Sequence, residues 1–142
     1  MTKREVSRIL ARASKEEAAQ IAACVYAGCN VQIMKQPQKT LVMVKARESI
    51  QKSLFYLGEV LATECMVLVD GVKGIGIVAG DDFEKAVSAA VIDGFLNQEG
   101  RQEEKQEILG RLLILERCQA EERAKMNRAV RKSKVNFNVM GE

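Results

Sequence analysis

The residues from Gly74 to Ala79 match a glycine pattern that binds the phosphates of dinucleotide cofactors. Gly74-Ile75-Gly76-Ile77-Val78-Ala79 fits G-x-G-x-x-G/A, in which a helix must begin inside the glycine run so that its N-terminus meets the pyrophosphate. Here Ile77 and Val78 continue a strand pattern, and the next helix signal follows Asp81. We therefore interpret the glycines as shaping a twisted strand, and we expect this chain alone to bind no cofactor.

Three acidic residues are candidates for acid–base or metal chemistry. Asp81 and Asp82 form a carboxylate pair that could serve as a general acid and base or bind Mg²⁺. They also precede a helix, where acidic side chains cap the first turn and interact favourably with the helix dipole, and we favour this role. Glu59 lies beside a predicted bulge at Gly58-Glu59, where its carboxylate is either functional or simply exposed to solvent.

Strong bases and nucleophiles are scarce in this chain. It has no histidine, which excludes histidine-dependent catalytic triads and zinc sites that use histidine. No two of the four cysteines have C-x-x-C spacing, so neither a metal site nor a disulfide framework is indicated. Cys24 lies in a helix pattern and Cys65 in a strand pattern, where a free thiol behaves as a small apolar side chain. We expect no catalytic residue and no metal site.

Composition indicates one globular domain without a membrane span. The 142 residues are 47% hydrophobic and 29% charged, which fits a single core that needs no disulfide or metal. All apolar runs are too short to cross a bilayer, and Met1 is followed directly by the polar residues 2–5. The sequence therefore predicts a cytoplasmic protein.

Charge is distributed unevenly along the chain. Residues 48–110 contain twelve acidic and five basic residues, whereas residues 123–142 contain six basic residues and a single acidic one, Glu142. The basic segment is either a solvated helix face or a surface for an acidic partner, and both interpretations stay open. One alternative function is thus a stand-alone basic adaptor that binds nucleic acid through residues 123–134.

Periodicity predicts an α+β fold with an antiparallel sheet covered by helices. Two short helices are expected over residues 4–13 and 14–28, the second opened by a capping box of Ser14 and Glu17. Runs at 31–34, 41–44, 54–69 and 72–78 predict a meander of about four strands, with a hairpin at 35–39 and a tight turn at Asp70-Gly71. The following helix has the apolar stripe Phe83, Ala86, Val87, Ala90, Val91 and Phe95.

The C-terminal part combines a long helix with a strand-like tail. A helix over residues 102–132 spans about 45 Å, longer than a compact domain of this size, so it either breaks near Gly110 or leaves the body. Strict alternation then places Val135, Phe137 and Val139 on one face of a predicted strand. We expect one domain over residues 1–142, in which residues 111–142 form a helical arm and extended tail that dock on partner subunits.

Five segments, in this order along the chain, carry a resemblance to a known family. They are LVMVKAR (41–47), FYLGE (55–59), residues 70–82 from Asp-Gly to Gly-Asp-Asp, AAVID (89–93) and SKVNFNVM (133–140). Together they resemble PhnG, the G subunit of the bacterial carbon-phosphorus lyase core complex, and the terminal Val-x-Phe-x-x-Met is the most specific match. The family usually has arginines where this chain has Glu64, Asp81 and Gly141-Glu142.

The resemblance implies a role in phosphonate catabolism. In this family the complex transfers ribose triphosphate from ATP to an alkylphosphonate and displaces adenine, and a radical S-adenosylmethionine subunit later cleaves the carbon-phosphorus bond. ATP is then a substrate of the complex, and this chain contributes to assembly while its isolated form is inactive. The implied partners are the nucleosidase-like, radical S-adenosylmethionine and H-type subunits, with no nucleic acid or membrane. Independently of the resemblance, exposed leucines on the long helix would favour self-association of the chain when its partners are absent.

The resemblance also selects candidate interaction or structural positions. They are the residues of this chain that match the family pattern, together with the alternating apolar residues of the tail: Arg47, Leu57, Gly58, Glu59, Gly80, Asp82, Asp93, Lys134, Val135, Phe137, Val139 and Met140.

Overall fold

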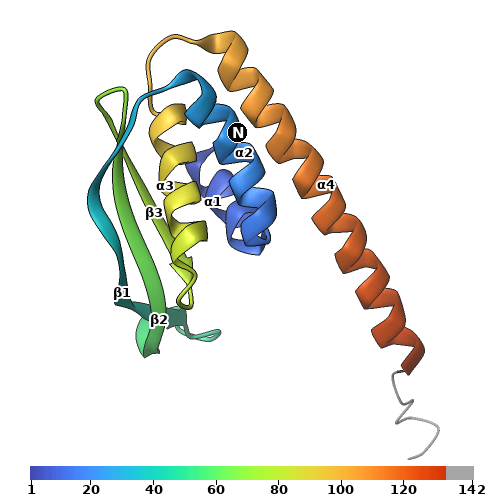
Figure 1. Cartoon of the computed structure of the whole chain (residues 1–142). Helices are drawn as coiled ribbons and strands as arrows, with labels where there is room; N and C mark the ends of the chain where they lie inside the picture. The colour runs from blue at the N-terminus through green and yellow to red at the C-terminus, as the bar shows by residue number, and fades with distance from the viewer. Residues whose placement is uncertain (134–142) are drawn as a thin grey trace, which may run out of the picture.

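The computed structural model describes residues 1–133 and has an α+β architecture (Figure 1). Its elements are α1 (Lys3–Arg12), α2 (Lys15–Gly28), β1 (Val31–Arg47), β2 (Leu54–Val69), β3 (Val72–Ala79), α3 (Phe83–Leu96) and α4 (Gln102–Ser133). The helices lie on one side of the sheet: α3 packs on β2 and β3, α1 and α2 pack on α3, and α4 contacts α1 and α2. The predicted fold class is confirmed.

Both N-terminal helices begin at a capping box. Thr2 accepts a hydrogen bond from the Glu5 N–H, and Ser14 accepts one from the Glu17 N–H, while each glutamate accepts from the backbone N–H of its cap residue. These bonds satisfy donors that an uncapped helix would leave without partners. The start predicted at Ser14 is confirmed, and α2 ends at Gly28, as expected.

Within residues 1–133, the sheet has three antiparallel strands in the order β1-β2-β3, not the predicted four. The hairpin expected at residues 35–39 is wrong, because these residues continue one strand of 17 residues. Pro37 is tolerated there since β1 is an edge strand, where a residue without an N–H is acceptable. Two register shifts between Ile33 and Gln38 absorb the extra residues, and the chain instead reverses between Arg47 and Leu54.

The glycines of β3 allow the sheet and α3 to touch backbone to backbone. A Cβ atom on Gly76 would lie 2.6 Å from the Ala90 nitrogen, and one on Gly74 would lie 2.6 Å from the Gly94 Cα. β3 continues to Ala79, so no helix begins inside the glycine pattern. The strand interpretation is confirmed, and the close packing of α3 supplies the physical reason for the glycines.

The helix α3 is buried on more than one face because it lies between the sheet and α2. The predicted stripe is confirmed for Ala86, Ala90, Val91 and Phe95, and Ser88, Ala89 and Ile92 are buried as well. Phe83 is wrongly included, since it is 44% exposed at the first turn, and Val87 is only partly buried. The prediction of a single apolar stripe assumes that only one face of the helix is packed. Because α3 packs against both the sheet and α2, small residues outside that stripe are buried as well.

The helix α4 is continuous over 32 residues and does not break at Gly110. Its first part is anchored to the body by Ile108, Leu112, Leu115 and Gln119, whose side-chain amide donates a hydrogen bond of 3.0 Å to the Ile9 carbonyl. Every residue from 120 to 133 is exposed, and Figure 1 shows this part of the helix projecting away from the body. We call residues 120–133 the α4 arm. Within residues 1–133, no helix combines the length and the apolar character needed to span a bilayer.

Hydrogen bonds and an ion pair around Asp70 link three loop segments of the fold. Asp70 and Gly71 both have positive φ, as the predicted two-residue turn between β2 and β3 requires. The Asp70 carboxylate accepts a hydrogen bond of 2.8 Å from the Asn30 N–H and lies 3.1 Å from the Arg101 guanidinium. Arg101 also donates to the Gly28 carbonyl, so the cluster connects the end of α2, the hairpin turn and the loop before α4. The Asn30 hydrogen bond, together with Arg101, lowers the pKa of Asp70.

This lowered pKa predicts an acid-dependent contribution of Asp70 to stability. Its carboxylate stabilises the fold above its unfolded pKa of about 3.9, and the contribution is lost as pH falls through the lower folded pKa. We expect Asp70→Asn to lower the free energy of unfolding at neutral pH, and the difference from the wild type to shrink in acid. Urea unfolding of both proteins across this pH range measures the difference, and a difference independent of pH would contradict this role.

Candidate functional site

The two-stranded end of the sheet lies outside the helical layer. Residues 41–61, which we call the distal hairpin, comprise the end of β1, the connection to β2 and the first half of β2. The third strand stops short of this region, since Ala79 at its end pairs with Ala62. Figure 1 shows the β1–β2 end extending beyond β3.

Both faces of the distal hairpin expose apolar side chains. Leu41 and Leu61 are directly opposite each other on one face and are 61% and 43% exposed. Val42 and Val60 form the neighbouring pair, whose side chains point to the other face, and they are 39% and 44% exposed. Large exposed side chains continue through Met43, Leu54, Phe55, Tyr56 and Leu57. A contiguous apolar surface of this kind is typical of an interaction site.

Four of the predicted residues come together in this hairpin. A register shift between Val44 and Lys45 leaves Leu57 without a partner on β1, which confirms the bulge predicted beside Gly58 and Glu59. Val44 pairs with Gly58, and the exposed Glu59 pairs with Met43. Arg47 donates a hydrogen bond of 3.1 Å to the Lys52 carbonyl and thereby helps to close the connection.

The other described candidates hold the fold together. Gly80 has φ of +82°, its N–H donates 2.8 Å to the Leu61 carbonyl at the base of the distal hairpin, and its carbonyl accepts from the buried Thr63 hydroxyl. Asp82 is the N-cap of α3 and accepts a hydrogen bond from the Lys85 N–H, which confirms the capping role. Asp93 accepts a hydrogen bond of 3.0 Å from the Ile75 N–H.

Lys134, Val135, Phe137, Val139 and Met140 lie outside the described residues, as does the predicted C-terminal strand.

The thiols and acidic residues that could carry chemistry have the following environments in residues 1–133. Burial raises the pKa of the Cys65 thiol, and burial with a hydrogen bond to Asp70 raises that of Cys29 although the Arg101 guanidinium lies 2.8 Å from its sulfur. Both thiols are therefore protonated at neutral pH and are poor nucleophiles. No group of three or more Cys, Asp and Glu residues in this part of the chain has the geometry of a metal site.

Two positions that differ from the usual family pattern have different environments. Glu64 accepts hydrogen bonds from Lys35 at 2.6 Å and from Gln38 at 3.2 Å, and the Lys35 bond is the main cause of its lowered pKa. Its carboxylate therefore links β1 to β2. Asp81 is exposed beside the α3 cap.

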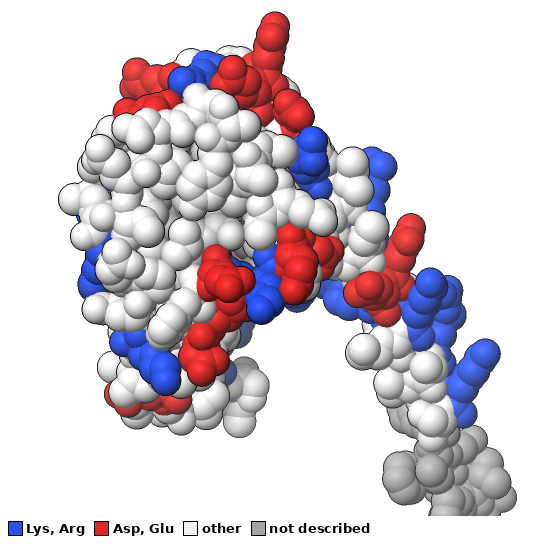
Figure 2. Space-filling view, in the orientation of Figure 1, with Lys and Arg blue, Asp and Glu red and all other residues white. Residues whose placement is uncertain are grey.

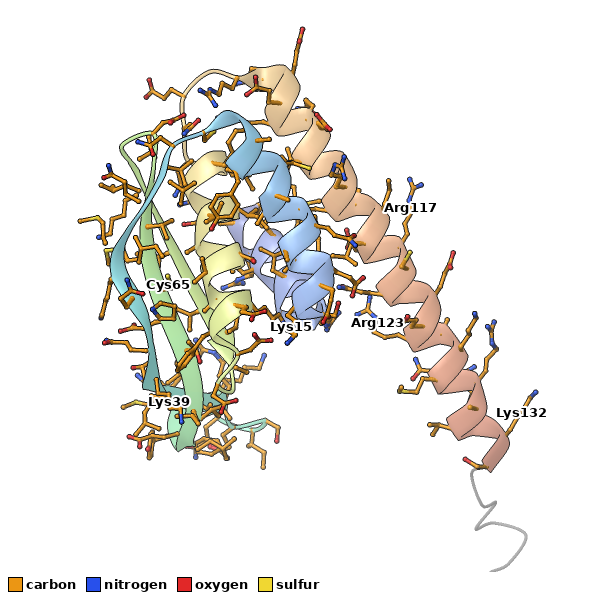
Figure 3. All side chains as sticks on the ribbon, in the orientation of Figure 1. Lys15, Lys39, Cys65, Arg117, Arg123 and Lys132 are labelled. Carbon is orange, nitrogen blue, oxygen red and sulfur yellow. The ribbon has the colours of Figure 1, made fainter. Side chains whose placement is uncertain are left out.

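The α4 arm is the second exposed surface. Arg123, Lys125, Arg128, Arg131 and Lys132 are all exposed along it, together with Met126 and Val130. Figure 2 shows basic side chains along the far part of α4, and Figure 3 places Arg123 and Lys132 on the length of helix beyond the body. This segment has no apolar face that packs on the described body, so its solvent exposure is unusually complete for a helix of a small domain.

The exposed apolar surface of the distal hairpin does not follow from the strand pattern alone. Periodicity assigns residues 54–57 to a strand and says nothing of their exposure. The available signal was the run of consecutive apolar residues Leu54-Phe55-Tyr56-Leu57, because a strand with apolar residues on both faces must be covered from both sides.

Together, these observations define a small α+β protein with two exposed surfaces, the distal hairpin and the α4 arm. The chain belongs to the family of the phosphonate metabolism protein PhnG, whose family model matches residues 1–141. A search of the curated proteins found no match. The protein therefore has a role in phosphonate metabolism.

Proposed function

We propose that this chain is a subunit of the carbon-phosphorus lyase core complex. In this role it supports the transfer of ribose triphosphate from ATP to an alkylphosphonate, with displacement of adenine, in the cytoplasm. Its contribution is assembly of the complex, and the catalytic groups lie on the nucleosidase-like, radical S-adenosylmethionine and H-type subunits. ATP is a substrate of the complex and is not held by this chain alone.

The observation that carries this proposal is the doubly exposed distal hairpin in a member of the PhnG family. An isolated two-stranded ribbon is only marginally stable in water, so apolar pairs on both of its faces gain most from burial against another chain. The α4 arm adds a second surface with the same need for a partner. The raised pKa of the Cys29 and Cys65 thiols, which makes them poor nucleophiles, supports an assembly role over a catalytic one.

The direct test is recovery of the complex from the natural host. A tagged full-length chain should co-purify with the nucleosidase-like subunit in a stable stoichiometric complex. Recovery of the tagged chain without any core subunit, under conditions in which the host grows on a phosphonate, would refute the proposed function.

We expect the purified chain alone to release no adenine from ATP, with or without a phosphonate. The sequence has no histidine, burial raises the pKa of the Cys29 and Cys65 thiols, and Asp82 is engaged as the cap of α3, so we expect the general base for ribose transfer to come from another subunit. Adenine release is measured by chromatography, with the reconstituted complex as the positive control. Turnover by the isolated chain, free of contaminating nucleosidase, would contradict the prediction.

A second candidate, the basic nucleic-acid adaptor, is favoured only by the exposed basic side chains of the α4 arm. Such binding would show a steep loss of affinity with salt and little sequence preference. Titration of labelled duplex DNA and RNA at two salt concentrations tests this function separately from assembly.

A further inference from the structure

The two edge strands of the sheet, β1 and β3, differ in whether their outward-pointing backbone groups have hydrogen-bond partners. At the β3 edge, Asp93 accepts a hydrogen bond from the Ile75 N–H and Asn97 donates one of 3.1 Å to the Lys73 carbonyl. Val6 and Leu10 of α1 line a small pocket together with residues 75–78 of β3. Side chains therefore satisfy backbone groups of this edge and α1 lies beside it, as is usual for edge strands that must not pair with another chain.

The β1 edge has no comparable cover over residues 38–47. Within residues 1–133, the backbone hydrogen bonds of this segment go to β2, and no helix or side chain satisfies the groups that point the other way. The register shifts at Ile33–Gln38, together with Pro37, interrupt the first half of β1. The register shift between Val44 and Lys45 leaves the unpaired residue, Leu57, on β2. Every residue of β1 from Gln38 to Arg47 therefore has a partner on β2, and this part of β1 contains no bulge.

The charged residues of β1 indicate the charge of a strand that could pair with its free edge. β1 contains Lys35, Lys39, Lys45 and Arg47 and no acidic residue. On its paired side it lies against β2, whose only charged residues are Glu59 and Glu64, and Lys35 forms an ion pair of 2.6 Å with Glu64. The partner that β1 already has is thus an apolar strand with acidic side chains.

We propose that the free edge of β1, over residues 38–47, binds an acidic strand of a partner subunit by β-augmentation. The added strand would alternate apolar and acidic residues, as β2 does in part, and its chain would also cover the exposed pairs Leu41/Leu61 and Val42/Val60. Backbone hydrogen bonds would supply affinity, while Lys39 and Lys45 would select for acidic side chains. This inference rests on the proposed function, because it names the surface through which this chain joins the assembly.

Charge argues against two other occupants from within this chain. A second copy of β1 in antiparallel register about Val42 would place Lys39 opposite Lys45, and like charges directly opposite each other are destabilising. Residues 134–142 contain one basic residue, Lys134, and one acidic residue, Glu142, which lies outside the alternating stretch 134–140, so the tail brings no net negative charge to this edge either.

The first experiment reverses the charge of the edge. Lys39→Glu with Lys45→Glu should weaken binding of the full-length chain to the other core subunits by about tenfold or more, with the difference shrinking at high salt. Figure 3 shows Lys39 on the distal part of the sheet, away from the helical body. The matched control is Arg4→Glu with Lys73→Glu, which makes the same charge change at exposed sites away from this edge and should bind as the wild type does.

The second experiment removes a single edge donor. Adjacent residues of a strand point their N–H groups to opposite sides, so one of Val42→Pro and Met43→Pro removes a bond to β2 and the other removes only a group on the free edge. The melting temperature identifies the tolerated variant. This variant should lose at least about tenfold in affinity for the core subunits, because proline blocks strand addition at that position.

The outcomes separate this inference from the proposed function. If the wild-type chain does not assemble with the core subunits, both the proposed function and the inference about the β1 edge are refuted. If wild-type chain assembles and the tolerated proline variant binds equally well, the edge is not the docking site and only this inference falls. It also falls alone if the charge reversal behaves like its control, or if sedimentation shows a dimer of the isolated wild-type chain that the tolerated proline variant abolishes.

Discussion

Gly76→Ala is expected to lower the free energy of unfolding by about 3 kcal/mol, at the upper end of typical overpacking costs. The added Cβ atom would collide with the Ala86 carbonyl oxygen and lie 2.6 Å from the Ala90 nitrogen. Both are backbone atoms of α3, which cannot move by changing a rotamer. The whole helix would have to shift away from β3, and it would lose contact with the sheet along its length.

The control for this substitution is Gly110→Ala in α4. A Cβ atom at Gly110 meets nothing within 4 Å, and the helix is continuous there, so alanine should raise the free energy of unfolding by up to about 1 kcal/mol. Chemical denaturation of the three proteins gives both differences. Equal stability of Gly76→Ala and the wild type would mean that α3 does not pack on β3 as closely as these distances indicate.

Phe137→Ala is expected to weaken assembly with the core subunits by about 2 kcal/mol or more, as for a buried aromatic anchor at an interface. The alternation of residues 134–140 places Phe137 between Val135 and Val139 on one face of the predicted strand. Because the α4 arm before it is exposed throughout, we expect this predicted strand to dock on another chain. Affinity for the reconstituted subunits is measured by titration at fixed salt.

The opposite face of the same strand supplies the matched control. Asn138→Ala truncates a neighbouring side chain that the alternation places away from Phe137, so it should change the affinity little. Deleting residues 134–142 should leave the melting temperature of the body unchanged, because α4 is anchored by Leu112, Leu115 and Gln119 well before the tail. Undiminished assembly of the truncated chain would exclude the tail as a docking element.

The physical origin of the exposed surfaces links these experiments. A chain of 142 residues can bury only part of its apolar surface in its own core. Here the core forms where α3 is held between the sheet and α2, and the distal hairpin and α4 arm extend beyond it. We expect two separate contacts with partners, one at the β1 edge and one at the tail. The losses of binding free energy caused by Lys39→Glu with Lys45→Glu and by Phe137→Ala should therefore be nearly additive when the substitutions are combined.

Local sequence signals determined the features that depend on a few neighbouring residues. Ser14 and Glu17 specify a capping box, Asp70-Gly71 a two-residue turn, and Asp82 a helix cap, because each uses hydrogen bonds or φ angles within four residues. The bulge near Gly58 was also predictable from an interrupted apolar run. The α+β class followed from the same periodicities, and the family resemblance followed from the order of five short segments.

The tertiary structure decided everything that depends on what lies beside a segment. Pro37 predicts a turn when taken alone, but it lies within a strand because β1 is at the sheet edge and register shifts absorb it. Phe83 belongs to an apolar stripe yet is exposed, while Ser88 is buried, because α3 packs on two sides. The free edge of β1 could not be predicted from sequence, since strand order is set by long-range pairing, which periodicity along the chain does not encode.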